Sequence, residues 1–167
     1  GVRLSYALQD TNNGGIADAL SYAEDFAEGG SVAVILGDNI FESDFKKAVS
    51  GFTGGAVAFF KKVKDPRRFG VPVFSKDGKR VLRVEEKPKN PKSSYAQTGF
   101  WIFDATVFSV LKTITPSARG ELEMTGVINR YLMNGTLSFD FVKKEWLDAG
   151  TFESLFKAAT FFYARGK

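Results

Sequence analysis

Apolar and polar positions along the chain follow the periods of strands and helices in turn. The run from Val32 to Leu36 is unbroken and largely β-branched, which is typical of a strand buried on both faces. The other predicted strands span 2–8, 55–63, 71–74, 81–85, 96–103 and 137–142. Apolar spacings of three and four residues predict helices at 16–27, 44–49, 105–111, 122–133 and 152–164.

The order of these elements indicates an α/β fold. A strand at 2–8, a helix at 16–27 and a strand at 32–36 favour a parallel pair of strands with a right-handed crossover. The sequence shows no repeat, no low-complexity tract and no linker, and 167 residues fit one domain of ordinary size. We therefore expect a single α/β unit over residues 1–167.

The composition restricts the chemistry that this unit can perform. The chain contains no Cys and no His. Disulfides, thiolate zinc sites, histidine metal sites and Ser-His or Cys-His nucleophiles are therefore excluded. Catalysis would have to rely on carboxylates, Lys and Arg, together with a metal ion that prefers oxygen ligands.

Charge and hydropathy narrow the choice of partners. The formal net charge is +4, and the basic residues are spread along the chain, which suits small anionic ligands better than nucleic acid. No apolar run approaches the ~20 residues that cross a membrane, and no signal peptide is visible. The expected protein is cytoplasmic, with neither a nucleic acid nor a membrane as its partner.

Two aspartates follow buried segments in a similar way. Gly37 ends the apolar run, and Asp38 comes directly after it; Asp148 follows two large apolar residues and precedes Ala-Gly. Ligands of open α/β sheets bind beyond the carboxyl ends of strands, where a carboxylate can hold Mg²⁺ and Mg²⁺ can hold phosphate oxygens. Asp38 and Asn39 would equally suit a turn that leads into the next helix, so the residues alone leave both interpretations open.

Two further loops have side chains that suit an anion. Lys87 precedes a proline at a strand end, although an edge strand protected by solvated charges would look the same. Arg119 precedes a helix and could hold phosphate bidentately. In that loop, Glu121 and Glu123 could simply complement the helix dipole. Taken alone, each of these two loops is explained better by a structural role of its charges than by anion binding.

The polar loop from Gln9 to Gly15 is the remaining candidate. A glutamine amide can pair with the edge of a base, and Gly14 and Gly15 would let a ligand approach the backbone closely. A surface loop with glycines before a helix is the alternative.

Six segments, taken together and in this order, resemble the sugar nucleotidyltransferase family, and within it the branch that transfers a thymidylyl group to glucose 1-phosphate. The likeness covers nearly the whole chain, and the combination is highly specific although each segment alone is weak. The segments are Leu36–Phe41, Asp65–Val71, Glu85–Ser93, Thr98–Gly99, Ala118–Thr125 and Trp146–Thr151.

The resemblance implies a fold, a reaction and a set of site residues. The fold would be a Rossmann-like, mixed, mainly parallel sheet of the nucleotide-diphospho-sugar transferase type. The reaction would move a nucleoside monophosphate from dTTP or UTP to glucose 1-phosphate and release pyrophosphate. By similarity, the catalytic and metal-binding residues are Asp38 and Asp148 with Mg²⁺, the nucleotide is bound by Gln9, Gly14, Gly15 and Asp38, and the sugar phosphate by Gly70, Glu86, Lys87, Gly99 and Arg119.

The chain departs from the family pattern in two places. The loop from Gln9 to Ile16 is one residue longer than the family's. The family's opening signature, a first strand with a Gly-rich loop that ends in Thr-Arg-Leu and a Lys-containing stretch, is absent. The absence of this signature implies an N-terminally truncated domain that lacks ~70 residues, about two βα units. We expect little activity from this chain alone, and a homo-oligomer that covers the open sheet edge. A non-catalytic homologue that binds sugar phosphate or nucleotide, as a regulatory or assembly partner, is the alternative.

Overall fold

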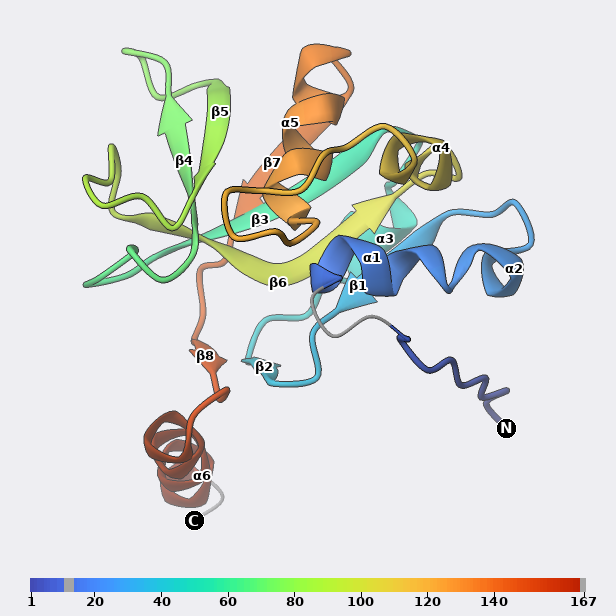
Figure 1. Cartoon of the computed structure of the whole chain (residues 1–167). Coiled ribbons are helices and arrows are strands. Elements are labelled where there is room, and N and C mark those ends of the chain that lie inside the picture. The colour runs from blue at the N-terminus through green and yellow to red at the C-terminus, as the bar shows by residue number, and fades with distance from the viewer. Residues whose placement is uncertain (11–13, 166–167) are drawn as a thin grey trace.

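The computed structural model describes residues 1–10 and 14–165 (Figure 1). The strands are β1 (Val32–Ile35), β2 (Asn39–Phe41), β3 (Ala56–Lys62), β4 (Gly70–Phe74), β5 (Val81–Glu86), β6 (Tyr95–Phe103), β7 (Leu137–Phe141) and β8 (Trp146–Asp148). The helices are α1 (Gly15–Ser21), α2 (Glu24–Ala27), α3 (Lys46–Ser50), α4 (Val107–Leu111), α5 (Met124–Met133) and α6 (Phe152–Arg165).

A four-stranded sheet in the order β1-β6-β3-β7 forms the centre of the described structure. β6 pairs antiparallel with both β1 and β3, whereas β7 pairs parallel with β3. Three of these strands therefore run in one direction and β6 runs against them. The sheet is mixed, as the resemblance implied.

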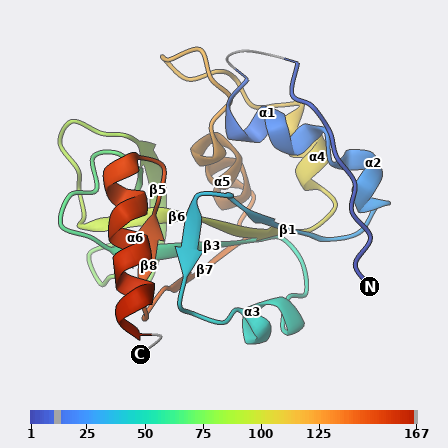
Figure 2. The same cartoon turned by 90° about the horizontal axis from the view of Figure 1, so that it is seen from below.

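The sheet has an apolar core on each face, because successive side chains of a strand point to opposite sides. Trp101 and Phe103 of β6 face α1, α4 and α5, whereas Phe100 and Ile102 pack with Phe59 of β3 on the opposite face. Figure 2 shows α1, α4 and α5 on one side of the sheet and α3 on the other. Phe41 of β2 and Trp146 of β8 pack in the core on the α3 side. β6 is the most completely buried strand, and its middle residues form the floor of the site described below.

The expected strand at 2–8 is wrong. Residues 1–10 form no helix or strand, and alternate apolar side chains of this segment, Val2, Leu4, Tyr6 and Leu8, are each at least 70% exposed. Alternation describes a face that could be buried, but a strand also needs a neighbour that pairs with its backbone, and in the described structure no such neighbour is present. The predicted parallel pair with residues 32–36 is wrong for the same reason.

β1 also differs from its prediction. It lies at the edge of the described sheet with β6 on one side, and Ile35 is 58% exposed, so the strand is not buried on both faces. The predicted helix at 16–27 is divided at Tyr22–Ala23 into α1, which buries Ala17 and Leu20, and α2, which buries no residue.

A short ribbon of β2 and β8 is the element that matters most for the site. Neither segment was predicted to be a strand, yet the two pair antiparallel, with Asn39 opposite Asp148 and Phe41 opposite Trp146. The strands predicted at 71–74 and 81–85 form as β4 and β5, which pair antiparallel as a hairpin. Among the described helices, none has the length and apolar character that would take it across a bilayer.

Candidate active site

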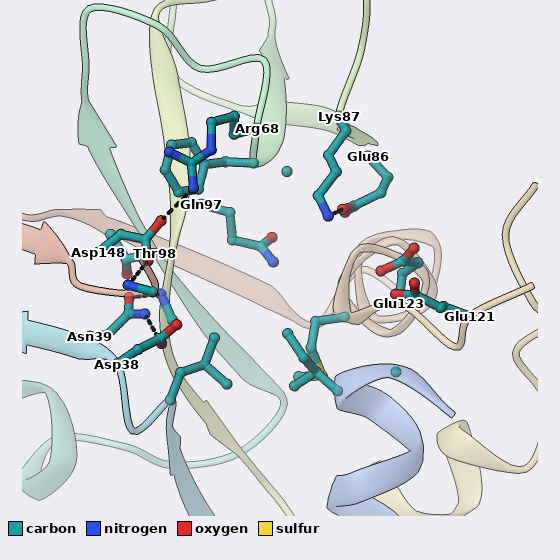
Figure 3. Close-up of a pocket in the computed structure, with 18 of the residues that line it drawn as sticks. Asp38, Asn39, Arg68, Glu86, Lys87, Gln97, Thr98, Glu121, Glu123 and Asp148 are labelled. Carbon is teal, nitrogen blue, oxygen red and sulfur yellow. Dashed lines mark hydrogen bonds and ion pairs between the residues drawn. The ribbon is translucent and has the colours of Figure 1, made fainter. Parts of the chain in front are cut away.

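A cleft of about 530 Å³ lies above the middle of β6. The β2–β8 ribbon forms one side, and the β4–β5 hairpin and the loop before α5 form the other (Figure 3). The sequence-predicted residues that line this cleft are Gln9, Gly15, Asp38, Gly70, Glu86, Lys87, Gly99, Arg119 and Asp148. Gly14 is the exception, because it lies just outside, where its carbonyl accepts a hydrogen bond from the Leu122 N–H at 3.1 Å.

The ribbon brings Asp38 and Asp148 together although they are far apart in the sequence. The backbone N–H of Ala149 donates to the Asp38 carbonyl at 2.8 Å. A Cβ atom added to Gly150 would lie 2.8 Å from Oδ2 of Asp38 and 3.2 Å from Oδ1 of Asp148. The two carboxylates therefore flank one small space, which exists because residue 150 has no side chain.

Asn39 holds Asp38 in this position. Its Oδ1 accepts hydrogen bonds from the Gly99 backbone N–H at 2.9 Å and from the Trp146 indole N–H at 2.7 Å. Its Nδ2 donates to Oδ1 of Asp38 at 2.8 Å. One amide thus ties β2 to β6 and β8 and orients the carboxylate. Sequence reasoning treated Asn39 as a turn residue and missed this role.

Two of the predicted glycines have packing reasons of their own. A Cβ atom on Gly99 would lie 2.6 Å from Oδ1 of Asn39, so a side chain there would displace the amide that orients Asp38. Gly15 has φ +74°, and its Cβ would lie 2.5 Å from the Leu122 carbonyl. Both positions need glycine for the fold, whether or not a ligand approaches them.

Glu86 and Lys87 lie across the cleft from the aspartates (Figure 3). Lys87 has a φ of 40°, a left-handed conformation that is uncommon for a residue with a side chain and occurs often at functional sites. Its Nζ is 3.9 Å from Oε1 of Glu86. Burial raises the pKa of the Glu86 carboxyl, the charge of Glu123 adds to this, and the nearby Lys87 and Arg119 act in the opposite direction.

Arg119 is bound to carboxylates of its own loop. Its guanidinium contacts Glu121 at 2.8 Å and Glu123 at 2.7 Å, and the hydrogen bond to Glu123 raises the pKa of Arg119. Ser117 also donates to Glu123, at 3.0 Å. The two glutamates therefore engage the arginine, and a phosphate at this place would have to share the guanidinium with them.

Two further polar groups lie at the ends of the cleft. Gln9 donates from Nε2 to the Gly15 carbonyl at 3.1 Å and to Asp18 at 2.6 Å, so its amide oxygen faces away from these two bonds. Arg68, which sequence reasoning did not single out, has its guanidinium 3.7 Å from Oδ2 of Asp148. Its place in the cleft could be found only once β8 was known to lie beside the loop before β4.

The floor of the cleft carries polar atoms without partners. Gln97, Gly99 and Trp101 alternate along β6 and all line the cleft. Within the described part of the chain, Oε1 of Gln97 and Nε1 of Trp101 are buried and have no hydrogen-bond partner. Buried polar atoms in proteins are rarely left unpaired. Neither residue was among the candidates from the sequence.

The two carboxylates on the ribbon suit a hard cation that the protein coordinates only in part. Among the described residues, no cluster of three or more His, Cys, Asp or Glu side chains could enclose a metal ion. Two carboxylates beside an open cleft match the way Mg²⁺ is usually held, by one or two carboxylates together with substrate phosphates and water. The residues present therefore fit Mg²⁺ if a phosphate ligand completes its coordination.

The order of motifs and this geometry agree with a comparison against known families. The model of the nucleotidyl transferase family matches residues 1–165. The chain belongs to the nucleotidyl transferase family. Among curated relatives, the glucose-1-phosphate thymidylyltransferase of Neisseria gonorrhoeae is 42% identical over 167 residues, and that of an Actinoplanes species is 42% identical over 169. These alignments cover 96% and 98% of this chain but only 57% and 55% of the relatives, so the chain spans little more than half of their length.

Solved structures of other proteins share the fold. A Bacillus anthracis protein assigned as a glucose-1-phosphate thymidylyltransferase, solved with a sucrose, superposes with a TM-score of 0.83 at 44% identity, over 91% of this chain and 62% of that one. A UDP-glucose pyrophosphorylase complexed with UDP-glucose superposes with a TM-score of 0.84 at 20% identity, over 96% of this chain and 66% of that one. The second likeness shows the fold alone. The family resemblance drawn from the six segments is thus confirmed.

Proposed function

We propose that this chain forms the sugar-phosphate and metal-binding part of a nucleotidyltransferase that acts on dTTP or UTP and glucose 1-phosphate. The observation that carries the proposal is that one cleft joins a pair of facing carboxylates, Asp38 and Asp148, to the cationic Lys87 and Arg119 on its opposite side. The curated relatives named above are glucose-1-phosphate thymidylyltransferases, which supports this choice of substrates.

In this reaction, an oxygen of the sugar phosphate forms a bond to the α-phosphorus of the nucleotide, and the bond to the leaving pyrophosphate breaks. Positioning and neutralisation of charge carry such a transfer. Asp38 and Asp148 would hold Mg²⁺, which neutralises phosphate charge when bound. Lys87 and Arg119 would bind the phosphate of the sugar and bring its attacking oxygen into line. Gln9 would read the base, with Gly14 and Gly15 beside it, and Gly70, Glu86 and Gly99 would border the sugar.

The assembly and location of the protein are expectations that go with this proposal. Large apolar side chains are exposed on α6, where Phe152 is 95% and Phe156 is 73% exposed, as well as along the N-terminal segment. Exposed apolar area of this kind favours association, so we expect an oligomer. We retain a cytoplasmic location as an expectation from the sequence.

Calorimetry with glucose 1-phosphate, and with dTTP or UTP in the presence of Mg²⁺, tests the proposal on the chain itself. We expect Asp38→Asn to remove the Mg²⁺-dependent part of nucleotide binding, and Asp140→Asn, an exposed aspartate on β7 outside the cleft, to leave it unchanged. If neither glucose 1-phosphate nor nucleotide binds, the proposal is wrong.

A pyrophosphate-release assay separates the enzyme from the non-catalytic binder. Because no phosphate-binding Gly-rich loop occurs in these 167 residues, we expect turnover far below the ~1 s⁻¹ of ordinary enzymes. Turnover at or above that rate would show that such a loop is dispensable. Binding of glucose 1-phosphate without any turnover would favour the alternative, a homologue that binds but does not catalyse by itself.

A further inference from the structure

We propose that the amide of Gln97 recognises one hydroxyl group of the sugar ring in the cleft. It would thereby select sugar phosphates that carry a hydroxyl at that position over the corresponding deoxy sugars. This inference rests on the proposed function, because it concerns the substrate of the same cleft. It assigns a role in specificity to a side chain that neither the sequence motifs nor the comparisons single out.

The unpaired amide oxygen is the first observation. Gln97 lies on β6 and is only 7% exposed, and its Oε1 is buried without a hydrogen-bond partner in the described structure. In Figure 3 the amide extends into the space between the Asp38–Asp148 side and the Glu86–Lys87 side. A buried acceptor that points into a ligand-sized cleft is explained if a bound ligand supplies the missing donor.

The neighbours of Gln97 place it with the expected sugar rather than with the nucleotide. A Cβ atom on Gly70 would lie 3.4 Å from the Cβ of Gln97. Gly70 is the partner of Glu86 in the hairpin, and the Phe69 carbonyl accepts a hydrogen bond from the Lys87 N–H at 3.1 Å. Gln97 therefore borders the same end of the cleft as the groups proposed to hold the sugar and its phosphate. The lack of a side chain at Gly70 leaves room for the Gln97 side chain.

The chemistry of the unpaired atom points to a hydroxyl. A carbonyl oxygen needs a hydrogen-bond donor, and phosphate oxygens that are ionised can only accept. A sugar hydroxyl can donate to Oε1, and if the amide is rotated by 180° it can instead accept from Nε2. Removing the hydroxyl would leave a buried group unpaired, and sites built around such a group reject the deoxy analogue strongly.

Selective labelling gives a direct test, because the chain contains only two glutamines, Gln9 and Gln97. With ¹⁵N at the glutamine side-chain amides, the spectrum should contain two pairs of signals. The pair that is missing from the spectrum of Gln97→Met belongs to Gln97. We expect saturating glucose 1-phosphate to shift the Gln97 signals, and inorganic phosphate at the same concentration to leave them in place. If Gln97→Met does not fold, Gln9→Met makes the assignment.

A series of monodeoxy analogues of glucose 1-phosphate tests the specificity by calorimetry. We expect the parent chain to bind one analogue at least about tenfold more weakly than glucose 1-phosphate. Gln97→Met keeps the volume of the side chain but not its hydrogen bonds, and should bring the two affinities within about twofold of each other. Asn134→Met makes a similar change at the exposed end of α5, outside the cleft, and should keep the parent's preference.

The outcomes distinguish this inference from the proposed function. If glucose 1-phosphate binds while the Gln97 signals do not move and all deoxy analogues bind alike, Gln97 does not contact the sugar, although the proposed function stands. If Gln97→Met folds and keeps the parent's preference, the inference is likewise overturned. If glucose 1-phosphate does not bind at all, this inference fails, and the proposed function fails with it if no nucleotide binds either.

Discussion

Replacement of Asn39 by alanine should destabilise the protein by an amount that the structure allows us to estimate. The Asn39 amide accepts two hydrogen bonds, from the Gly99 N–H and the Trp146 indole, and both are partly buried. A hydrogen bond contributes about 1 kcal/mol net, and a buried donor that is left unpaired costs about 1–3 kcal/mol. Because water from the cleft can reach these donors, we expect Asn39→Ala to lower the free energy of unfolding by about 2 kcal/mol.

Urea denaturation followed by tryptophan fluorescence measures this loss, since Trp146 is itself a partner of Asn39 and the chain has only one other tryptophan, Trp101. With an m-value of about 2 kcal/mol/M, the midpoint should fall by about 1 M. Asn134→Ala, at the exposed end of α5, is the matched control and should stay within about 0.5 kcal/mol of the parent. A change in Asn39→Ala as small as that of the control would refute the reasoning.

Asn39→Asp separates stability from the orientation of Asp38. The new carboxylate keeps an acceptor for the Gly99 and Trp146 donors but replaces the Nδ2 donor with an oxygen near 2.8 Å from Asp38. Two carboxylates at this distance raise the pKa of the pair. The stability of this variant should therefore be near that of the parent at low pH and should fall as the pH rises through the raised pKa. A variant whose loss of stability is the same at every pH would contradict this account.

Three further changes test other parts of the cleft. Gly150→Ala places a methyl group between the two aspartates and should abolish Mg²⁺-dependent binding of dTTP, which Gly37→Ala, with open space around the new methyl group, should retain. Since burial raises the pKa of Glu86, its ionisation costs stability as the pH rises above its ordinary value of 4.5, and Glu86→Gln should remove this decline in urea titrations at several pH values. Lys87→Gln should weaken glucose 1-phosphate binding in calorimetry by about tenfold, as expected for a charge-assisted hydrogen bond, whereas the same change at Lys89, outside the cleft, should not. Equal affinities of the Gly150 and Gly37 variants for dTTP, or of the Lys87 and Lys89 variants for glucose 1-phosphate, would contradict the corresponding assignment, as would an unchanged pH dependence of stability in Glu86→Gln.

Local patterns were sufficient for the elements whose burial depends on their own periodicity. The strands predicted at 55–63 and 96–103 form as β3 and β6 within one residue at each end, and the apolar face of the predicted helix at 122–133 packs on the sheet as α5. These segments carry enough apolar surface to determine their conformation. The motifs around Asp38, Lys87 and Arg119 also carry the family resemblance, which the family model confirms.

Other features depended on pairing between distant segments, which local periodicity does not encode. The segment at 2–8 alternates like a strand yet has no partner in the described structure, whereas the short segments at 39–41 and 146–148 form strands because they pair with each other. That pairing brings Asp38 beside Asp148 and places the Asn39 amide between β2, β6 and β8.

The environment of each polar group was likewise set by tertiary packing. Arg119 was predicted from its position before a helix, but only the folded loop shows its charge engaged by Glu121 and Glu123. The sequence contains a glutamine at position 97 within a predicted strand, and gives no sign that its oxygen is buried and unpaired at the floor of a cleft. The sequence by itself therefore determined which chemical groups are available, whereas the tertiary structure decided which of them meet, because burial and hydrogen bonding depend on neighbours that are distant along the chain.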